Sequence, residues 1–324
     1  MSLDTTQNKL DFDLAASATD GDAASVSRLL SLGAAPLSNN GSSLRFAAQN
    51  GHVECVKLLI PVSDPKARDS YALQLASRNG HAECVRLLIP GSNPNADNLL
   101  ALHWAVERGH LECVKLLIPT AKDKADLDQV LCFAAMNGRA ECVEMLIPVS
   151  NPKAGNSRAL LQAAERGHLE CVRLLIPVSN PKAGNSRALL HAAERGYPDC
   201  VSLLIPVSNP MACRSRALQA ASLAGHAACA RLLIPFSDAL SLNHKPFLSA
   251  IDGGHAGIVA LMIEREPSLC AILEFPQRFP AAHARALGRM HCELAALFAS
   301  ISERMELARG LHGGNEQRSS APRL

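Results

Sequence analysis

The sequence predicts an all-α solenoid built from about ten copies of one helix-turn-helix unit. Three observations predict it: a strict residue period, two helical apolar stripes in each period, and an aromatic content of only 3%, which leaves Ala, Leu, Ile and Val to form the core. The period is carried by glycines, separated by one step of 30 residues and then seven steps of 29. They are Gly21, Gly51, Gly80, Gly109, Gly138, Gly167, Gly196, Gly225 and Gly254, with a looser copy at Gly288.

The first helix of each unit is predicted to end at the repeat glycine. In one unit Leu160, Ala163 and Ala164 lie at i, i+3 and i+4, a spacing that places them on one narrow helical stripe. Gly167 follows the stripe and suits a left-handed helix end, because glycine has no Cβ to clash in that conformation.

The second helix follows the glycine at once. Cys171 to Ile176 form a broader apolar face, and Glu170 stands in the first turn, where the helix dipole favours a carboxylate. Pro177 ends this helix, and Val178 to Arg187 form a turn that leads into the next unit. Two such short helices cannot bury their apolar faces alone, so the units must stack into a continuous core.

These residues resemble the ankyrin repeat. Residues 101–110, Ala-Leu-His-Trp-Ala-Val-Glu-Arg-Gly-His, resemble the first half of its pattern, and residues 167–172 resemble the second half. The resemblance covers residues 12 to 263, and more weakly 280 to 300. It implies a concave face that binds other proteins. The family period of 33 falls to 29 here, so we expect shortened hairpin fingers between the units.

The repeat pattern also divides the chain. We expect a flexible N-terminus over residues 1–11 and the ankyrin-like array over 12–263. Residues 264–309 are interpreted as a degenerate last repeat with a C-terminal capping helix or helix pair, because terminal units of solenoids differ from the rest. The Gly, Ser, Arg and Pro of residues 310–324 indicate a disordered tail.

Eleven cysteines raise the question of disulfides or metal binding. Stacked helices lie ~8–10 Å apart, farther than a disulfide allows, so equivalent cysteines of successive units should be buried, reduced and unbridged. Cys213 lies outside the repeat position, beside two arginines, and is the cysteine that we expect to be exposed. The seven cysteines at the repeat position are Cys55, Cys84, Cys113, Cys142, Cys171, Cys200 and Cys229.

No residue set in the sequence predicts an active site. His81 and Glu83 match the His-x-Glu of zinc deaminases, but the partner motif is absent and His-x-Glu recurs at residues 52, 110 and 168. A recurrent position indicates structural hydrogen bonds at the start of the second helix. The glycines are single and form no phosphate-binding loop. We therefore predict no catalytic residues, no metal and no cofactor.

The residues that differ between units are the candidates for partner binding. The two residues before each glycine change while Leu, Ala and Val are kept, and Trp104, the only tryptophan, is of the residue type that most often anchors interfaces. Ordinary surface variation is the alternative explanation. These candidates are Arg78, Asn79, Trp104, Glu107, Arg108, Met136, Asn137, Glu165, Arg166, Glu194 and Arg195.

A basic stripe is the second candidate surface. Three successive connections in the C-terminal half carry six basic residues and no acidic one, whereas the preceding connections are mixed in charge. Such a stripe could attract an acidic partner surface. Duplication is a rival explanation, because residues 147–167 and 176–196 differ only in Gln162 and His191. The six residues are Lys153, Arg158, Lys182, Arg187, Arg214 and Arg216.

The predicted function is a non-catalytic protein-protein interaction scaffold. A polyanion or nucleic-acid binding module that uses the basic stripe is the alternative, disfavoured by a net charge of +2 and by few aromatic residues for base stacking. We expect a monomer with no membrane segment and no Sec-type signal, in a reducing cytoplasmic compartment. A bacterial effector exported into a host cell by another route is a further hypothesis, because the residues after Met1 are polar.

Overall fold

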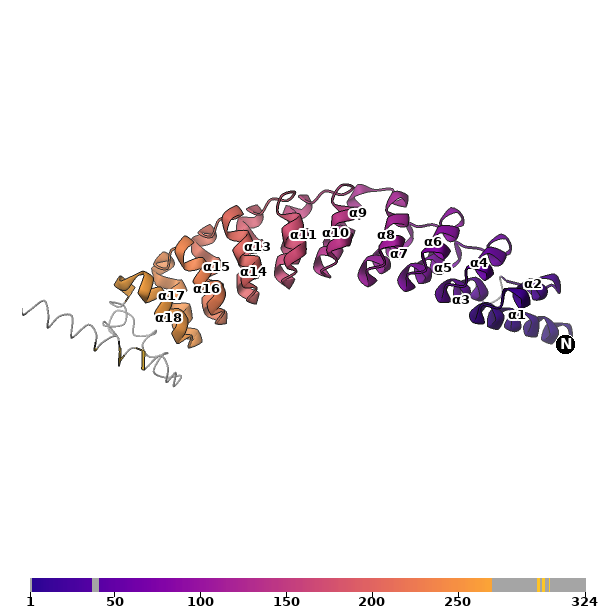
Figure 1. The fold of residues 1–324 in the computed structure, drawn as a ribbon, viewed down its shortest axis with the longest axis horizontal. Coiled ribbons are helices and arrows are strands. Elements are labelled where there is room, and N and C mark those ends of the chain that lie inside the picture. Colours follow the sequence, from indigo (N-terminus) through magenta and orange to yellow (C-terminus); the bar gives the residue numbers. More distant parts are fainter. Residues whose placement is uncertain (1, 37–40, 270–295, 298, 301–302, 304–324) are drawn as a thin grey trace, which may run out of the picture. The chain divides into compact units, whose positions relative to one another are not determined.

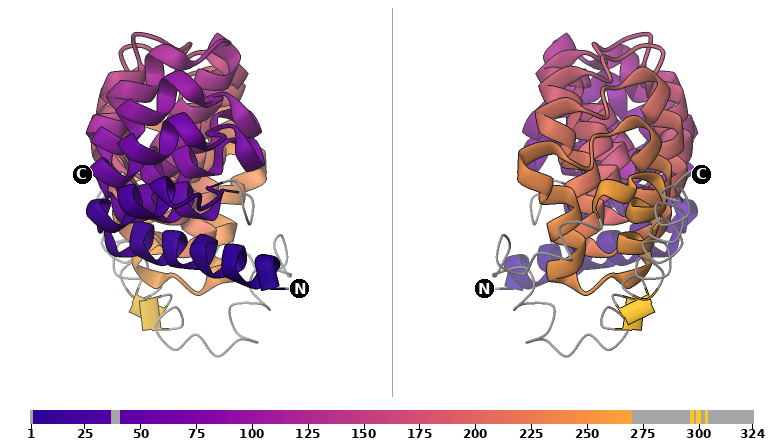
Figure 2. Two further views of the ribbon diagram at one scale, coloured as in Figure 1. Left: turned by 90° about the vertical axis from the view of Figure 1, so that its right-hand side faces the viewer. Right: turned by 90° about the vertical axis from the view of Figure 1, so that its left-hand side faces the viewer.

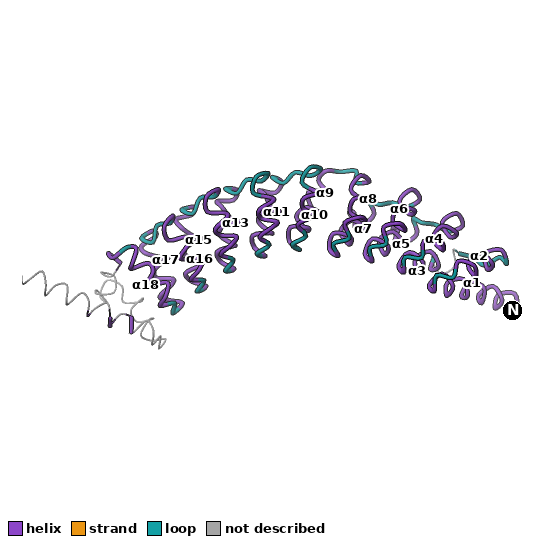
Figure 3. Tube along the Cα trace, in the orientation of Figure 1, coloured by secondary structure: helices purple, strands orange, loops and turns teal. Residues whose placement is uncertain are grey.

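The computed structural model describes residues 2–36, 41–269, 296–297, 299–300 and 303, and the described residues form helices without any strand (Figures 1 and 3). They divide into two compact units. The first comprises the residues up to 163 together with 173–179, and the second comprises 164–172 and the described residues from 180 onward. The predicted all-α solenoid is confirmed.

Each unit is a stack of helix pairs. The helices of the first unit are α1 (Ser2–Asp20), α2 (Ala23–Ser31), α3 (Ser42–Asn50), α4 (Val53–Leu59), α5 (Ala67–Asn79), α6 (Ala82–Leu88), α7 (Ala96–Arg108), α8 (Leu111–Leu117), α9 (Lys124–Met136) and α10 (Ala140–Leu146). Helices α11 (Ala154–Arg166) and α12 (Leu169–Leu175) contribute residues to both units. The helices of the second unit are α13 (Ala183–Arg195), α14 (Pro198–Leu204), α15 (Ala212–Ala224), α16 (Ala227–Leu233), α17 (Ser241–Gly253) and α18 (Ala256–Arg265).

Helices of the same kind pack side by side within each unit. In the first unit α1, α3, α5, α7 and α9 form one layer, and α2, α4, α6, α8 and α10 form the other. In the second unit α13, α15 and α17 form one layer, and α14, α16 and α18 the other. Seen along the array, the helices of the first unit (Figure 2, left) and those of the second (Figure 2, right) lie one behind another.

The core lies between the two layers and consists of small aliphatic side chains. Val143 of α10 and Leu131 of α9 are almost completely buried. Small residues are needed there because neighbouring helices approach each other both along and across the layers. In α15 the buried side chains are Ser215, Ala217, Leu218, Ala221 and Ser222.

The helix ends are those that the sequence predicts. Helix α3 ends at Gly51, whose φ of 76° is left-handed and whose N–H donates to the carbonyl of Ala47. The second helices end one residue before the Ile-Pro pair: in α12 the last residue is Leu175, two before Pro177. In five repeats a short 3-10 turn contains the proline. Proline is tolerated there because the residues of the first helical turn do not need their N–H groups for hydrogen bonds within the helix. These turns are Ile60–Val62, Ile89–Gly91, Ile118–Thr120, Ile205–Val207 and Ile234–Phe236.

The shortened connections contain a left-handed turn. In α13 the residues Gly184, Asn185 and Ser186 have φ of 56°, 60° and 61°, and right-handed helix follows from Arg187. Equivalent turns lie at the start of four other first helices. An L-residue in this conformation costs ~1–2 kcal/mol, and glycine and asparagine adopt it most readily. The other turns are Arg68 to Ser70, Asp97 to Leu99, Gly155 to Ser157 and Cys213 to Ser215.

The left-handed turns connect successive repeats. The buried hydroxyl oxygen of Ser186 accepts a hydrogen bond of 2.9 Å from the backbone N–H of Asn209, which belongs to the next repeat. Ser70 accepts in the same way from Asn93 at 2.7 Å. A third copy joins Ser215 to the N–H of Asp238 at 2.8 Å. The turn therefore places a side-chain oxygen where a backbone N–H of the following repeat needs a hydrogen-bond acceptor.

The N-terminus differs from the expected flexible segment over residues 1–11. Helix α1 begins at Ser2, and its Asp11 is buried, with Oδ1 accepting hydrogen bonds from the N–H of Ala35 and from the amide of Gln7. Residues 2–11 carry few apolar side chains, so their sequence has no apolar stripe that would predict a helix there. At the other end of the chain, the structure describes only a few isolated positions beyond Leu269. The predictions for residues 270–309 and for the tail over 310–324 therefore lie outside the described residues.

Candidate functional site

Four positions of each first helix share one side of the helix, and all four remain accessible in α7, α9 and α13, whereas Gln74 and Leu75 of α5 are buried. These positions, nine, six, five and two residues before the repeat glycine, have the spacing i, i+3, i+4, i+7 and so lie on one side of the helix. We call the surface that they form the first-helix face. In α13 its members are Arg187, Leu190, His191 and Glu194.

Arg78 and Trp104 meet on the first-helix face of the first unit. The guanidinium carbon of Arg78 lies 4.5 Å from the centroid of the Trp104 ring, within the range of a cation–π contact. The two residues belong to successive repeats, α5 and α7, and both side chains are half-buried. Two separately predicted candidates therefore form one composite surface element.

Further aromatic residues occupy the same face. Arg45 lies 5.8 Å from the ring centroid of Phe46 and 6.0 Å from that of Tyr71. Phe46 and Tyr71 are 38% and 37% exposed. We call Phe46, Tyr71, Trp104 and Phe133 the aromatic row. The sequence analysis singled out Trp104 alone, although the i, i+3, i+4, i+7 spacing within each repeat contains the signal for the others.

At the far end of the aromatic row, His103 packs edge-on against Phe133, with ring centroids 5.0 Å apart and an interplanar angle of 78°. Burial lowers the pKa of His103, opposed by the charge of Asp126, so the imidazole is neutral at pH 7. His103, Phe133, Met136 and Arg158 line a cavity of about 330 Å³. This cavity brings the predicted candidates Met136 and Arg158 together.

A second hollow of the first unit, of about 530 Å³, lies beside Arg78. Its lining includes Asn79 and Arg108, so three of the predicted candidates meet there. Asn79 also donates from its amide to the carbonyl of Gln49, 2.7 Å away in the preceding repeat. Asn137 by contrast is bound within its own helix, because its amide donates to the carbonyl of Phe133 at 2.8 Å.

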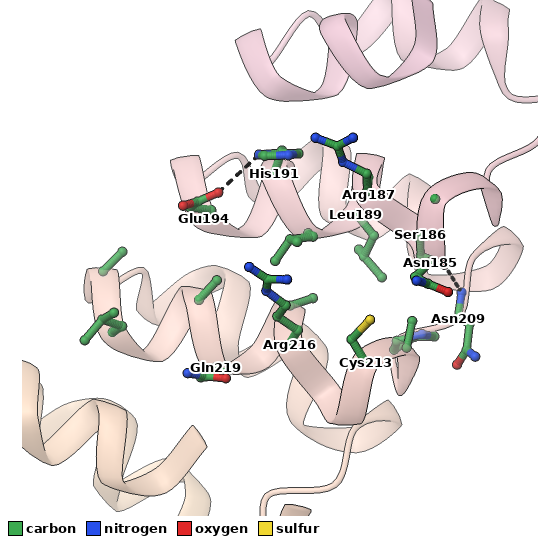
Figure 4. A pocket seen from close by; sticks show the side chains of 18 residues that line it. Asn185, Ser186, Arg187, Leu189, His191, Glu194, Asn209, Cys213, Arg216 and Gln219 are labelled. Atoms are coloured by element: carbon green, nitrogen blue, oxygen red, sulfur yellow. Dashed lines mark hydrogen bonds and ion pairs between the residues drawn. The ribbon is translucent and has the colours of Figure 1, made fainter. Parts of the chain in front are cut away.

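The second unit contains a groove of about 640 Å³ between α13 and α15 (Figure 4). Arg187 and Arg216 lie along it, and the exposed side chain of Leu223 contributes apolar surface. Glu194, also in the lining, pairs with Nδ1 of His191 at 3.1 Å. The groove thus combines two arginines, which can bind anionic groups, with an apolar lining that can contact uncharged side chains.

The remaining acidic and basic candidates of the second unit are surface residues. Arg195 pairs with Glu165 across one repeat at 3.5 Å, and Arg166 is exposed. Glu107, in the first unit, contributes its backbone carbonyl, which accepts from Nε of Arg139 at 2.9 Å. These contacts bind successive repeats together, so the two residues before each glycine serve packing as well as the surface.

All six residues of the predicted basic stripe are exposed. Lys153 and Arg158 lie in the first unit and the other four in the second, so a continuous stripe across both stays a prediction. Arg187 and Arg216 line the groove of the second unit, whereas Lys182 and Arg214 do not. Lys245 occupies the same repeat position as Arg187 and Arg216 and is exposed. The sequence analysis missed it because the stripe was assembled from connections and not from helix positions.

The recurrent histidines have the structural role that the sequence predicts. Nε2 of His110 lies 3.0 Å from the carbonyl oxygen of Arg78, to which its Nε2–H tautomer donates. The imidazole also covers Gly80, where an added Cβ would lie 2.6 Å from Nδ1. The same contact to the preceding repeat is made by His52, His81, His226 and His255.

The cysteines at the repeat position are buried and free, as predicted. Burial raises the pKa of the Cys84 and Cys113 thiols to about 11, which keeps them protonated and unreactive at neutral pH. Cys213 is exposed, as expected. Within the part of the chain that the structure describes, no group of three His, Cys, Asp or Glu side chains could hold a metal ion.

Comparison with protein families identifies the family to which this stack of helix pairs belongs. The family model described as ankyrin repeats (3 copies) matches residues 12–98, 44–130, 131–212 and 189–271. The chain belongs to the ankyrin-repeat family. Proteins of this family generally bind other proteins, and ankyrin repeat domains are typically non-catalytic binding scaffolds.

Solved ankyrin repeat domains are similar to part of the chain. The domain of human ASB11 is 26% identical over 55% of this chain and 96% of its own length, with a TM-score of 0.44. An ankyrin repeat domain from Acinetobacter baumannii AYE is 26% identical over 51% and 97%, with a TM-score of 0.44. That of Bcl-3, a member of the IkappaB family, is 26% identical over 59% and 97%, with a TM-score of 0.49. A comparison with curated proteins found no match.

A helix that crosses a bilayer must be both long and apolar. No helix in the described ranges is both long enough and apolar enough to cross a membrane.

Proposed function

We propose that this ankyrin-repeat protein is a non-catalytic scaffold that binds a protein partner on its first-helix face. The observation that carries the proposal is the aromatic row of the first unit, with the guanidinium of Arg78 stacked on Trp104. Exposed aromatic and arginine side chains are the residues that most often contribute large parts of the binding energy of protein interfaces. In ankyrin repeats this face corresponds to the concave binding surface.

The distribution of residues between packing and surface supports the proposal. The side chains that are the same in successive repeats, such as Val85 and Val114, are fully buried and hold the stack together. Those of the first-helix face differ between repeats, and in α7, α9 and α13 they remain accessible. A rigid stack that presents varied side chains loses little conformational freedom on binding, which favours affinity.

The test is a pull-down combined with proximity labelling in cytosolic extract. The parent chain is compared with a double variant, Phe46→Ala with Trp104→Ala, and with Leu58→Ala as the matched control. Leu58 is 36% exposed but lies on α4, in the other layer. Circular dichroism confirms that every variant is folded. A partner retained by the control and lost by the double variant supports the proposal, and a partner retained by both contradicts this choice of surface.

The basic stripe extends the same experiment. A variant with glutamate in place of all six basic residues tests whether the partner has an acidic surface. Loss of the partner supports binding through the C-terminal half. If the partner is kept, the stripe is a by-product of the duplication of residues 147–167.

The alternative function is binding of a polyanion or nucleic acid. The exposed side chains of Arg187 and Arg216 along one groove favour it. A salt titration separates the two functions, because release of counterions from phosphates makes the logarithm of affinity fall steeply and linearly with the logarithm of salt concentration. A shallow dependence favours a protein partner.

The remaining hypotheses concern location and assembly. A reducing compartment agrees with nine free cysteines among the described residues. Export into a host cell rests only on the polar residues after Met1, and translocation of a reporter fusion tests it. Sedimentation of the purified chain tests the monomer.

A further inference from the structure

Three basic side chains of the second unit occupy one repeat position. Arg187, Arg216 and Lys245 each lie nine residues before a repeat glycine, at the start of the right-handed part of α13, α15 and α17. All three are exposed. We call them the basic row. Because α15 packs against both α13 and α17, the row runs across three neighbouring helices.

The basic row is not neutralised by the residues that the structure describes. None of its three side chains has a hydrogen-bond or ion-pair partner among the described residues. Other charges nearby are paired: Glu194 with His191 at 3.1 Å, and Arg195 with Glu165 at 3.5 Å. A set of regularly spaced cations without internal partners is complementary to regularly spaced anions on a binding partner.

The spacing of the row selects the conformation of that partner. Neighbouring helices pack ~8–10 Å apart, which sets the distance from one cation to the next. A polyproline II segment repeats every three residues with a rise of ~3.1 Å per residue, so side chains three apart point the same way and lie about 9 Å apart. In a β-strand, side chains on one face recur at about 6.6 or 13 Å, and neither distance matches the row.

The residues farther along the same three helices also disfavour a helical partner. Seven residues along each first helix from the basic row, about 10 Å away, stand Glu194, Leu223 and Asp252. An acidic helix, with side chains ~10–12 Å in diameter, would bring its far side close to these carboxylates. A thinner extended segment stays on the basic side and packs its uncharged residues on Leu190 and Ala220.

We propose that the second unit binds an acidic segment of a protein partner in polyproline II conformation, with a carboxylate at every third residue aligned on the basic row. The inference deepens the proposed scaffold function and rests on it. The proline or apolar residues between the carboxylates contact the lining of the 640 Å³ groove. Arginine suits this role because its planar guanidinium can hold a carboxylate through two hydrogen bonds.

The test measures binding of synthetic peptides to the full chain by fluorescence anisotropy at low salt. The first peptide is fluorescein-labelled (Glu-Pro-Pro)5, and the second has the same composition with the five glutamates in one block. We expect the spaced peptide to bind at least about fivefold more tightly. Equal affinity for the two peptides would overturn the inference, because simple charge attraction does not depend on spacing.

Two variants locate the site. Arg216→Glu should weaken binding of the spaced peptide at least about tenfold. Arg231→Glu makes the same change of charge on the exposed side of α16, in the other layer of the same unit, and should leave the affinity within about twofold. A similar loss in both variants would overturn the inference, since it would reflect net charge alone.

Two further probes test the class of partner. A helical peptide with glutamates seven residues apart should bind more weakly than the spaced peptide, and tighter binding overturns the predicted conformation. A single-stranded dT15 that binds more tightly than the peptide, and is lost in Arg216→Glu, assigns the row to nucleic acid instead. The aromatic row is untouched by these variants, so partner capture lost in Phe46→Ala with Trp104→Ala still supports the scaffold function if all peptide binding fails.

Discussion

The guanidinium of Arg78 lies over the indole ring of Trp104, with 4.5 Å between the guanidinium carbon and the ring centroid. The two residues are 26 positions apart and belong to different repeats. Their contact exists only because α5 and α7 pack side by side. It shows how a stack of similar units forms a surface that no single unit contains.

This contact can be followed by fluorescence, because Trp104 is the only tryptophan of the chain. Removing the stacked side chain in Arg78→Ala uncovers one face of the ring, so acrylamide should quench its emission more strongly. Arg86→Ala, which removes an exposed arginine on α6, is the control and should leave quenching unchanged. If Arg78→Ala quenches like the parent, the ring is not covered by the guanidinium in solution.

The histidine bridges should contribute to stability. His110→Ala removes the hydrogen bond to the carbonyl of Arg78 and the cover over Gly80, so we expect the free energy of unfolding to fall by about 1–2 kcal/mol. His110→Arg should restore most of it, because Arg139 makes the equivalent bond to Glu107. Urea denaturation followed by circular dichroism measures both. An alanine variant as stable as the parent would show that the bridge contributes nothing.

The left-handed turn at the start of α15 offers a stabilising substitution. Cys213 has a φ of 48°, and its equivalents in two earlier repeats are Gly155 and Gly184. Cys213→Gly should raise the free energy of unfolding by up to about 1 kcal/mol, as the relief of left-handed strain exceeds the entropy that glycine adds to the unfolded chain. Cys213→Ala keeps the Cβ and should change little. The prediction fails if the glycine variant unfolds at a lower urea concentration than the alanine variant.

The buried thiols should make stability depend on alkaline pH. Their pKa values are about 11 in the folded chain against an ordinary value of 9.0, so the unfolded chain loses these protons first as the pH rises. The contribution is complete below pH 9 and is lost as the pH rises towards 11, by about 1 kcal/mol per thiol at pH 10. The five thiols are those of Cys84, Cys113, Cys142, Cys200 and Cys229.

Urea denaturation at several pH values between 8 and 10.5 checks this. Cys113→Ala should reduce the loss of stability between pH 8 and pH 10 by the share of one thiol. Cys213→Ala, which removes an exposed thiol, is the control. A loss in Cys113→Ala as large as that of the parent would show that this thiol is not responsible.

The sequence was sufficient for features that depend on neighbours along the chain. The spacing of Leu160, Ala163 and Ala164 predicted the first helix, Gly167 its end and Pro177 the end of the second. Burial of Cys84 and its equivalents followed from their constant place in an apolar helix face. These features succeed because helix periodicity, left-handed helix ends and proline breaks are local properties of the backbone.

Other features could not be obtained in this way. Helix α1 begins at Ser2, and its Asp11 accepts a hydrogen bond from Ala35, a contact that the polar sequence of residues 2–11 does not show. The left-handed turns were not predicted either, although Gly184 and Asn185 are residue types that favour them. Arg68 carries no such signal, and in that turn Ser70 accepts a hydrogen bond from the next repeat.

The sequence by itself determined that this chain is a stack of short helix pairs with an aliphatic core, because each repeat carries the same local signals. The tertiary structure decided which side chains of different units meet: Arg78 with Trp104, and Arg187 beside Arg216 along one groove. Such neighbours are a whole repeat apart in the sequence. Their distance is set by how closely the helices pack and by the conformation of the turns between them, which no single repeat specifies.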